Sequence, residues 1–157
     1  MAVRLVTSGG HIVDPVVINM YASGVVQRNS VVELSRTGGA GVFPASSSST
    51  STGVFGICLD YAQGASDVQV KVIPFASGQI WEVDTVNTVS TAQIGLRHVM
   101  NDNLNLRNTA TDLGAGNNAT GIFRAIAVSS ISTGSGKLLG YFRTSEGTVF
   151  PSGTTYA

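Results

Sequence analysis

The sequence predicts a mainly β protein, a single compact β-sandwich or barrel-like domain with an extended N-terminal arm and little helix. First, Val68, Val70 and Val72 alternate with polar residues, and a period of two places them on one face of a strand. Second, apolar residues nowhere recur at i, i+3, i+4 and i+7 over three turns, as they would in an amphipathic helix. Third, small and polar residues interrupt the chain at short intervals, as turns do in β proteins. We therefore expect at most one short helix, at residues 88–96.

Three consecutive runs form the centre of the prediction, at residues 54–60, 67–72 and 80–84. Tight turns of small residues separate them, so we expect a three-stranded meander. The chain then divides into an arm at residues 1–10, a β-rich domain at 11–145 and a C-terminal tail at 146–157. The other expected strands are residues 16–21, 25–27, 31–34, 42–45, 96–100, 104–109, 122–129 and 137–142.

Charge is scarce over the 157 residues. Nine Lys and Arg balance nine Asp and Glu, and charged residues make up 11%, against about 25% in ordinary soluble domains. Phosphate binding relies on Lys and Arg, so a neutral chain with no basic cluster in its sequence argues against nucleic acid and against an anionic membrane. An uncharged surface of this kind favours coverage by other protein, although an uncharged monomer is also compatible with it.

The ends and the single cysteine carry further expectations. The first ten residues contain no apolar stretch typical of a signal peptide, and no apolar run approaches the ~20 residues of a membrane helix. We expect a soluble protein synthesised in the cytoplasm.

Cys58 lies in an apolar run, where a free cysteine behaves as a small core residue. Trp81 and the strand phenylalanines are likewise expected in the core.

Motifs for metals and phosphates are absent from the sequence. His11 and His98 lack the spacing of a zinc site, and His98, in an apolar run, is expected to be a hydrogen-bonded structural residue. Residues 132–138 resemble a phosphate-binding loop, but Ile131 stands where that motif needs its first glycine and Leu138 where it needs Ser or Thr. A hairpin turn explains this stretch better.

Two acids remain as catalytic candidates. Glu82 and Asp84 lie on one face of one expected strand, about 7 Å apart by strand rise, and paired carboxylates can perform acid–base hydrolysis. They can equally be a solvated strand face, or salt-bridge partners of Arg97 or Arg124 at a subunit contact. We favour these last interpretations, and expect no catalytic residue, no metal, no cofactor and no enzyme activity.

Seven short stretches between residues 22 and 143 carry a resemblance to known proteins. They are Ala22-Ser23-Gly24-Val25-Val26, Val31-Val32-Glu33-Leu34, residues 53–59, Trp81-Glu82-Val83-Asp84, Ala92-Gln93-Ile94-Gly95, residues 120–128 and residues 137–142. In these stretches the chain resembles the capsid decoration (cement, or head-stabilising) proteins of tailed bacteriophages.

The resemblance implies a structural protein of the virion. Such proteins are β-rich, often homotrimeric, and clamp neighbouring major capsid proteins on the outer surface of the expanded head. Lambda-type members add a strand to the capsid surface with an N-terminal arm. By this analogy the docking arm is Ala2, Val3, Arg4, Leu5 and Val6, and its partner is the major capsid protein.

A second class of function is a carbohydrate- or receptor-binding β module of a phage tail or fibre. An exposed Trp or Tyr beside Asn and Asp in one groove would favour it.

Overall fold

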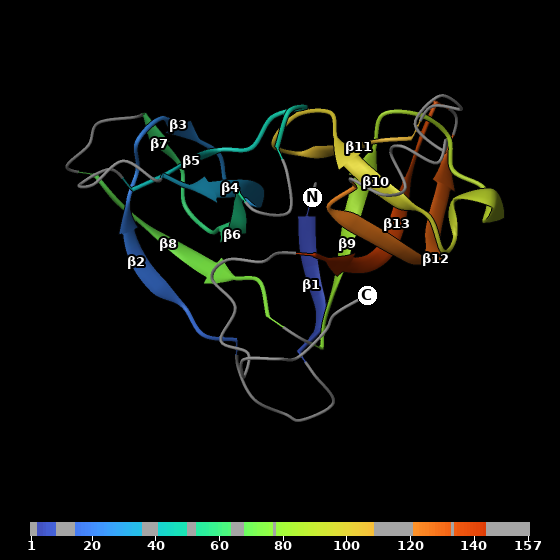
Figure 1. The fold of residues 1–157 in the computed structure, drawn as a ribbon, viewed down its shortest axis with the longest axis horizontal. Helices are drawn as coiled ribbons and strands as arrows, with labels where there is room; N and C mark the ends of the chain where they lie inside the picture. The colour runs from blue at the N-terminus through green and yellow to red at the C-terminus, as the bar shows by residue number, and fades with distance from the viewer. Residues whose placement is uncertain are drawn as a thin grey trace.

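The structure is a computed structural model that describes residues 3–8, 15–35, 41–49, 53–63, 68–76, 78–108, 121–132 and 134–143. Figure 1 shows two β units side by side along the longest axis of the molecule, a curled sheet on the left and a barrel on the right. The regular secondary structure of the described part is almost entirely strand, with one short 3-10 helix. The predicted fold class, a compact and mainly β domain, is confirmed.

The barrel is formed by five strands from the second half of the chain. Their order is β9-β11-β10-β12-β13, and β13 pairs back with β9 to close the ring. The β9–β11 pair is parallel, whereas the other pairs are antiparallel. A sixth strand, β1, pairs with β9 beside β11. The strand bounds are β1 Val3–Ser8, β9 Gln79–Thr85, β10 Arg97–Met100, β11 Asn105–Arg107, β12 Phe123–Ser132 and β13 Ser135–Phe142.

The curled sheet has the order β2-β8-β6-β4-β5. Its two ends approach each other where Ala22, just after β2, bridges to Val42 at the start of β5, and Ser23 N donates to Val42 O at 2.7 Å. A separate pair, β3–β7, lies beside it. The bounds are β2 Ile18–Tyr21, β3 Val25–Val26, β4 Ser30–Leu34, β5 Val42–Pro44, β6 Val54–Cys58, β7 Ala62–Gln63 and β8 Gln69–Pro74.

A continuous core joins the two units. Strand β6 is buried along its whole length: Ile57 packs in the cluster shared with the barrel, and Cys58 in the cluster inside the curled sheet. In the shared cluster Phe75 stacks on Phe142, with ring centroids 4.1 Å apart, and meets Trp81 edge-on at 5.7 Å. Trp81 is 1% exposed, so its predicted core position is confirmed.

The predicted meander is only partly right. Strands β6 and β8 pair as neighbours, but β9 leaves the curled sheet and enters the barrel, where it pairs with β1, β11 and β13. In the barrel, Trp81 and Val83 on the inner face of β9 pack in the core that the two units share.

Val3–Ser8 is a strand of the barrel sheet and not an unpacked arm, which corrects the expected separation of residues 1–10 from the β domain. Val3 pairs with Val83 and Leu5 with Trp81, and Val3 is 1% exposed. β1 pairs with an edge strand of the same chain, because β11 covers only the last residues of β9 on that side.

The short helix lies where the sequence predicts it. Thr91–Gln93 forms one 3-10 turn. Ser90 caps it, since the Ser90 hydroxyl accepts from Ala92 N at 3.3 Å and Gln93 Oε1 accepts from Ser90 N at 2.5 Å. Gly95 follows with φ of +84°, a conformation that glycine adopts without strain.

Candidate functional site

Glu82 is the most buried carboxylate among the described residues and is enclosed by partners. It is 8% exposed and lies directly opposite Arg4 in the β1–β9 pair. Arg4 Nη2 and Nε donate to Glu82 Oε1 at 3.2 and 3.3 Å, and the Ser129 hydroxyl of β12 donates to Oε2. These contacts connect the edge strand to the barrel.

These contacts also set the charge of Glu82. The hydrogen bond from Ser129 and the guanidinium of Arg4 lower the pKa of Glu82, although burial alone would raise it. A catalytic general acid needs a carboxyl whose pKa is raised toward the working pH. These contacts therefore favour the ionised form of Glu82. A lowered pKa is the opposite of what a general acid needs, which counts against the hydrolase interpretation.

Asp84 also has a cation beside it. Lys137 of β13 lies opposite Asp84 in the register, and its ammonium forms an ion pair with Asp84 Oδ1. The salt-bridge interpretation of the two acids is correct in kind, but the partners are Arg4 and Lys137 of the same chain. The expected partners Arg97 and Arg124 lie opposite each other on β10 and β12.

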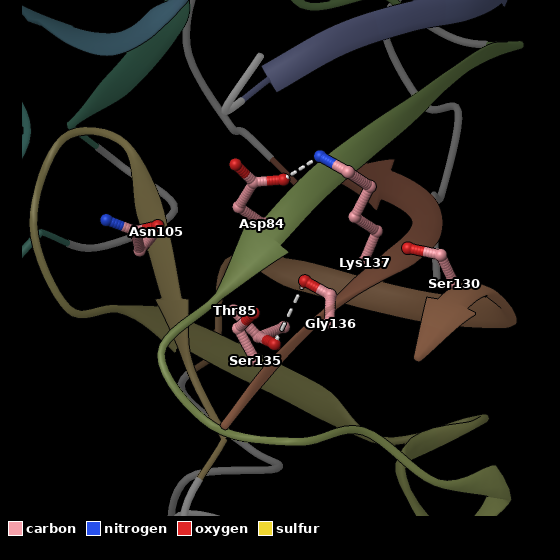
Figure 2. A pocket seen from close by; sticks show the side chains of 7 residues that line it. All are labelled: Asp84, Thr85, Asn105, Ser130, Ser135, Gly136 and Lys137. Carbon is pink, nitrogen blue, oxygen red and sulfur yellow. Dashed lines mark hydrogen bonds and ion pairs between the residues drawn. The ribbon is translucent and has the colours of Figure 1, made fainter. Parts of the chain in front are cut away.

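A small polar cleft lies where four barrel strands end (Figure 2). It encloses about 250 Å³, below the range of about 300–1,000 Å³ typical of small-molecule sites. Thr85 Oγ1 donates to Gly136 O at 3.2 Å across its base. Its lining offers hydroxyl, amide, carboxylate and ammonium groups but no aromatic ring. The lining residues are Asp84, Thr85, Asn105, Ser130, Ser135, Gly136 and Lys137.

His98 and Cys58, the described residues considered for metal binding or thiol chemistry, both lie in the core. Among the residues that the structure describes, no three His, Cys, Asp or Glu are placed to hold a metal. His98 is fully buried, with Nε2 3.3 Å from Gln93 O, as predicted for a structural histidine. Cys58 is also fully buried, its thiol donates to Asp60 O at 3.1 Å, and burial raises the pKa of that thiol. His11 lies outside the described residues.

The stretch that resembles a phosphate-binding loop is the β12–β13 hairpin, as predicted. Ser132 pairs with Ser135, and Gly134 between them has φ of +77°. No helix follows, because Ser135 begins β13 at once. Backbone N–H groups at a helix start are what such a loop uses to hold phosphate, so this turn lacks that chemistry.

The large apolar side chains that the described residues leave exposed fall into two main groups, one in each β unit. The sheet patch consists of Val16, Val17, Tyr21, Val25, Tyr61 and Val68, which belong to or flank β2, β3, β7 and β8. The barrel patch consists of Ile94, Ile126 and Ile131, which lie beside the 3-10 helix and along β12. In Figure 1 the first group of elements lies in or beside the curled sheet on the left, and the second lies in the barrel unit on the right.

Most of the predicted docking residues already make contacts within the chain. Val3 is buried, Leu5 is half-buried against the core, and Arg4 binds Glu82. Val6 is 47% exposed, because the register shift between Leu5 and Thr7 leaves it without a partner on β9. Ala2 lies outside the described residues. Nothing in these contacts tests a docking role.

Comparison with known proteins leaves the chain without an assigned family. No protein-family model matches it, and no curated protein matches it in sequence. Within the described ranges, no helix has the length and apolar character needed to cross a membrane.

Sequence reasoning missed both ion pairs and the closure of the barrel. Arg4 and Glu82 are far apart in the chain, and only the β1–β9 register brings them together. The available signal was the alternation of Val3 and Leu5 with Arg4, which is the pattern of a strand with one buried face.

Proposed function

We propose that this protein is a capsid decoration protein that binds the outer surface of an icosahedral phage head. In this role it clamps neighbouring copies of the major capsid protein and stabilises the expanded shell. It would be synthesised in the host cytoplasm, act as a homotrimer and reside in the virion, and it would need neither a cofactor nor a catalytic site.

The observation that carries this proposal is the exposed apolar side chains on both β units. In the sheet patch Tyr61 is 57% exposed and Val25 50%, and in the barrel patch Ile131 is 65% exposed and Ile126 45%. Apolar side chains of this size gain free energy when a partner protein covers them. A clamp must touch two neighbouring subunits at once, and apolar groups on two units joined by one core meet that need.

The core that joins the two units supports the same role. The aromatic cluster of Phe75, Trp81, Phe123 and Phe142 lies in the core shared by the barrel and the curled sheet. Close packing of these side chains holds the two units together, so contacts at both patches act on one body. Weak contacts at each end add through effective concentration, which raises overall affinity by about 10²–10⁴.

Docking by the arm is a separate route. Among the described strands β1 is the edge strand of its sheet and pairs with β9 on one side only, so a capsid strand could pair with its other edge while Val3 stays packed in the core. We place the main contacts in the two patches. Docking by the arm stays a prediction, and Val6 is the arm residue that can test it without unfolding the strand.

Co-sedimentation with expanded, undecorated phage capsids tests the proposal. The wild-type protein should pellet with the shells at a saturable ratio and raise the temperature at which they come apart. Tyr61→Ser or Ile131→Thr, each confined to one patch, should weaken pelleting and abolish the shell stabilisation, because a protein held at one end cannot clamp. Failure of the wild-type protein to pellet with any expanded shell would overturn the proposal.

Val6→Thr is the matched control, since it removes similar exposed apolar surface outside both patches. Pelleting equal to the wild type is expected. Loss of pelleting in this variant alone would move the contact from the patches to the arm.

The polar cleft supports a second candidate function, carbohydrate binding. Its hydroxyl and amide groups suit sugar hydroxyls, but the aromatic platform typical of sugar sites is missing because Trp81 is buried. Asp84→Asn, tested on a glycan array, separates the two functions. Glycan binding that this variant abolishes would favour the tail or fibre module, whereas capsid binding should be unaffected.

A further inference from the structure

Four polar side chains of the cleft form one row across neighbouring strands of the barrel. Lys137 on β13 is the register partner of Asp84 on β9 and of Ser130 on β12. Asn105 on β11 is the partner of Asp84 on its other side. Figure 2 shows this polar row in the order Asn105, Asp84, Lys137, Ser130. Neighbouring strands lie about 4.7–4.9 Å apart, so one small ligand can contact adjacent members of the row.

The polar row lies on the outer face of the barrel. Val83, Leu106 and Leu138, each next in sequence to a member of the row, are fully buried in the core. Side chains alternate between the two faces of a strand, so the row points away from the core. It lines the cleft of about 250 Å³ where the strands end, and a ligand in the cleft would therefore meet it.

The ion pair inside the row holds its carboxylate in place. Lys137 binds Asp84 Oδ1, which balances the negative charge of Asp84. A carboxylate has two oxygens and about four lone-pair sites, and Asp84 Oδ2 has no hydrogen-bond partner among the residues that the structure describes. Asp84 thus keeps the capacity to accept hydrogen bonds while its charge is already paired.

Asn105 and Ser130 add two further groups on either side of this pair. Asn105 Nδ2 donates to both carboxylate oxygens of Asp102 at 3.1 Å, which fixes the orientation of the amide. Asn105 Oδ1 accepts no hydrogen bond from the described part of the chain. Ser130 is exposed, and its hydroxyl can both donate and accept.

These groups select a ligand that donates hydrogen bonds and carries no positive charge. Asp84 Oδ2 and Asn105 Oδ1 are acceptors only, so the ligand must supply N–H or O–H groups. A cationic ligand would lie beside the Lys137 ammonium, which repels it. Hydroxyl groups on adjacent carbons of a sugar ring donate without charge and lie close enough together to reach neighbouring members of the row.

We propose that the polar row binds a single sugar ring through two adjacent hydroxyl groups. The proposal rests on carbohydrate binding, the second candidate function, and is independent of capsid decoration. One ring is the expected size, because the cleft is smaller than the sites that hold drug-sized ligands. The hydrogen-bonding row takes the place of the aromatic ring that the cleft lacks.

An NMR titration of the full-length protein tests the proposal, with methyl glucoside, methyl mannoside and methyl galactoside as probes. At least one glycoside should shift the backbone amide signals of the cleft residues saturably. A Kd in the millimolar range is expected, because few hydrogen bonds form and no aromatic ring is stacked. Saturable shifts confined to residues outside the cleft would overturn the placement, and no saturable shift with any of the three would overturn the site itself.

Asp84→Asn and Ser130→Ala test the polar row directly. Asp84→Asn should weaken glycoside binding about tenfold, because hydrogen bonds to charged groups are the stronger ones. Ser130→Ala changes an exposed side chain, so the fold should be kept, and binding should weaken about threefold through the loss of one neutral hydrogen bond. Melting temperatures of both variants confirm that they are folded. Unchanged affinity in both variants would overturn the proposal.

Glu33→Gln and Ser23→Ala are the matched controls, since they make the same chemical changes in the curled sheet unit. Glu33 lies on β4, and Ser23 is exposed between β2 and β3. Glycoside affinity equal to that of the wild type is expected for each. Weakening equal to that of the cleft variants would show that binding does not depend on the polar row.

Butylammonium chloride provides the competing arm. Tighter binding of this cation than of any glycoside, lost in Asp84→Asn, would overturn the choice of a neutral sugar. A glycan array separates the remaining failures. Array binding that Asp84→Asn leaves intact would overturn the cleft as the sugar site while carbohydrate binding stands. An empty array together with an absence of NMR shifts would overturn both.

Discussion

Arg4 lies directly opposite Glu82, and its guanidinium donates to a single oxygen of that carboxylate from Nη2 at 3.2 Å and Nε at 3.3 Å. The other carboxylate oxygen accepts from Ser129. One side chain of β9 thus holds β1 on one side and β12 on the other. The N-terminal strand is therefore fixed to the barrel by charge as well as by the burial of Val3.

Glu82→Gln should lower the free energy of unfolding at pH 7 by about 1 kcal/mol, since it removes a half-exposed ion pair and a charge-assisted hydrogen bond. The pKa of Glu82 is lowered in the folded state. Its stabilisation is therefore fully present above the ordinary glutamate pKa of about 4.3 and is lost as the pH falls through the lowered folded value. Urea unfolding at pH 7 and pH 3 should show the difference between variant and wild type shrinking at pH 3.

Glu33→Gln controls for general loss of negative charge, because Glu33 lies on β4 in the other sheet. Its effect on the free energy of unfolding should be smaller at pH 7. A Glu82→Gln effect that stays constant between the two pH values would refute the assignment of this stabilisation to the ionised carboxylate.

Val3→Ala should destabilise the fold by about 1–3 kcal/mol, because it leaves a cavity in the shared core. Val6→Ala is matched in chemistry but removes atoms from a side chain that is 47% exposed, and should change stability by less than about 0.5 kcal/mol. Urea unfolding of the two variants measures the loss in the free energy of unfolding that each substitution causes. Equal and small effects would show that β1 is an arm without a structural role.

Gly140→Ala should be destabilising by about 1–3 kcal/mol through overpacking. A Cβ at Gly140 would lie 2.0 Å from Arg124 O and 2.7 Å from the Phe123 ring, so β12 and β13 would have to move apart. Gly24→Ala, where the nearest atom would be Pro44 Cδ at 3.1 Å, should have a milder effect. Thermal unfolding of both variants makes the comparison, and a neutral Gly140→Ala would contradict the close β12–β13 approach.

Cys58 should resist thiol reagents in the folded protein. Burial raises the pKa of its thiol and removes it from solvent, and the thiolate is the reactive form. Labelling with Ellman's reagent at pH 8 should proceed only as fast as the protein unfolds, and should become complete at once in urea. Rapid labelling of the native protein would mean that the curled sheet opens at β6.

The local β structure was predictable from short patterns. Val70 and Val72 alternate with exposed Gln69 and Lys71 in β8, as the period of two indicated. The 3-10 helix lies within residues 88–96, where a short helix was expected. These features depend on neighbours in the sequence, which a single sequence displays.

The arrangement of the strands depends on distant partners and was not predictable in the same way. Periodicity assigned Trp81 and Val83 to one face of a strand, but nothing local states that β9 pairs in parallel with β11 and antiparallel with β1. The Arg4 partner of Glu82 follows from the β1–β9 register, and the pairing of Arg97 with Arg124 follows from that of β10 and β12. The expected salt-bridge partners of Glu82 and Asp84 were therefore wrong, although both acids do form ion pairs.

Co-sedimentation of the wild-type protein, Tyr61→Ser and Ile131→Thr with expanded, undecorated capsids tests the central claim most directly. A two-ended clamp predicts saturable pelleting and shell stabilisation by the wild type, with stabilisation lost when either patch is altered. A wild-type protein that stays in the supernatant with every expanded shell would contradict capsid decoration. Pelleting that neither substitution weakens would contradict the clamp.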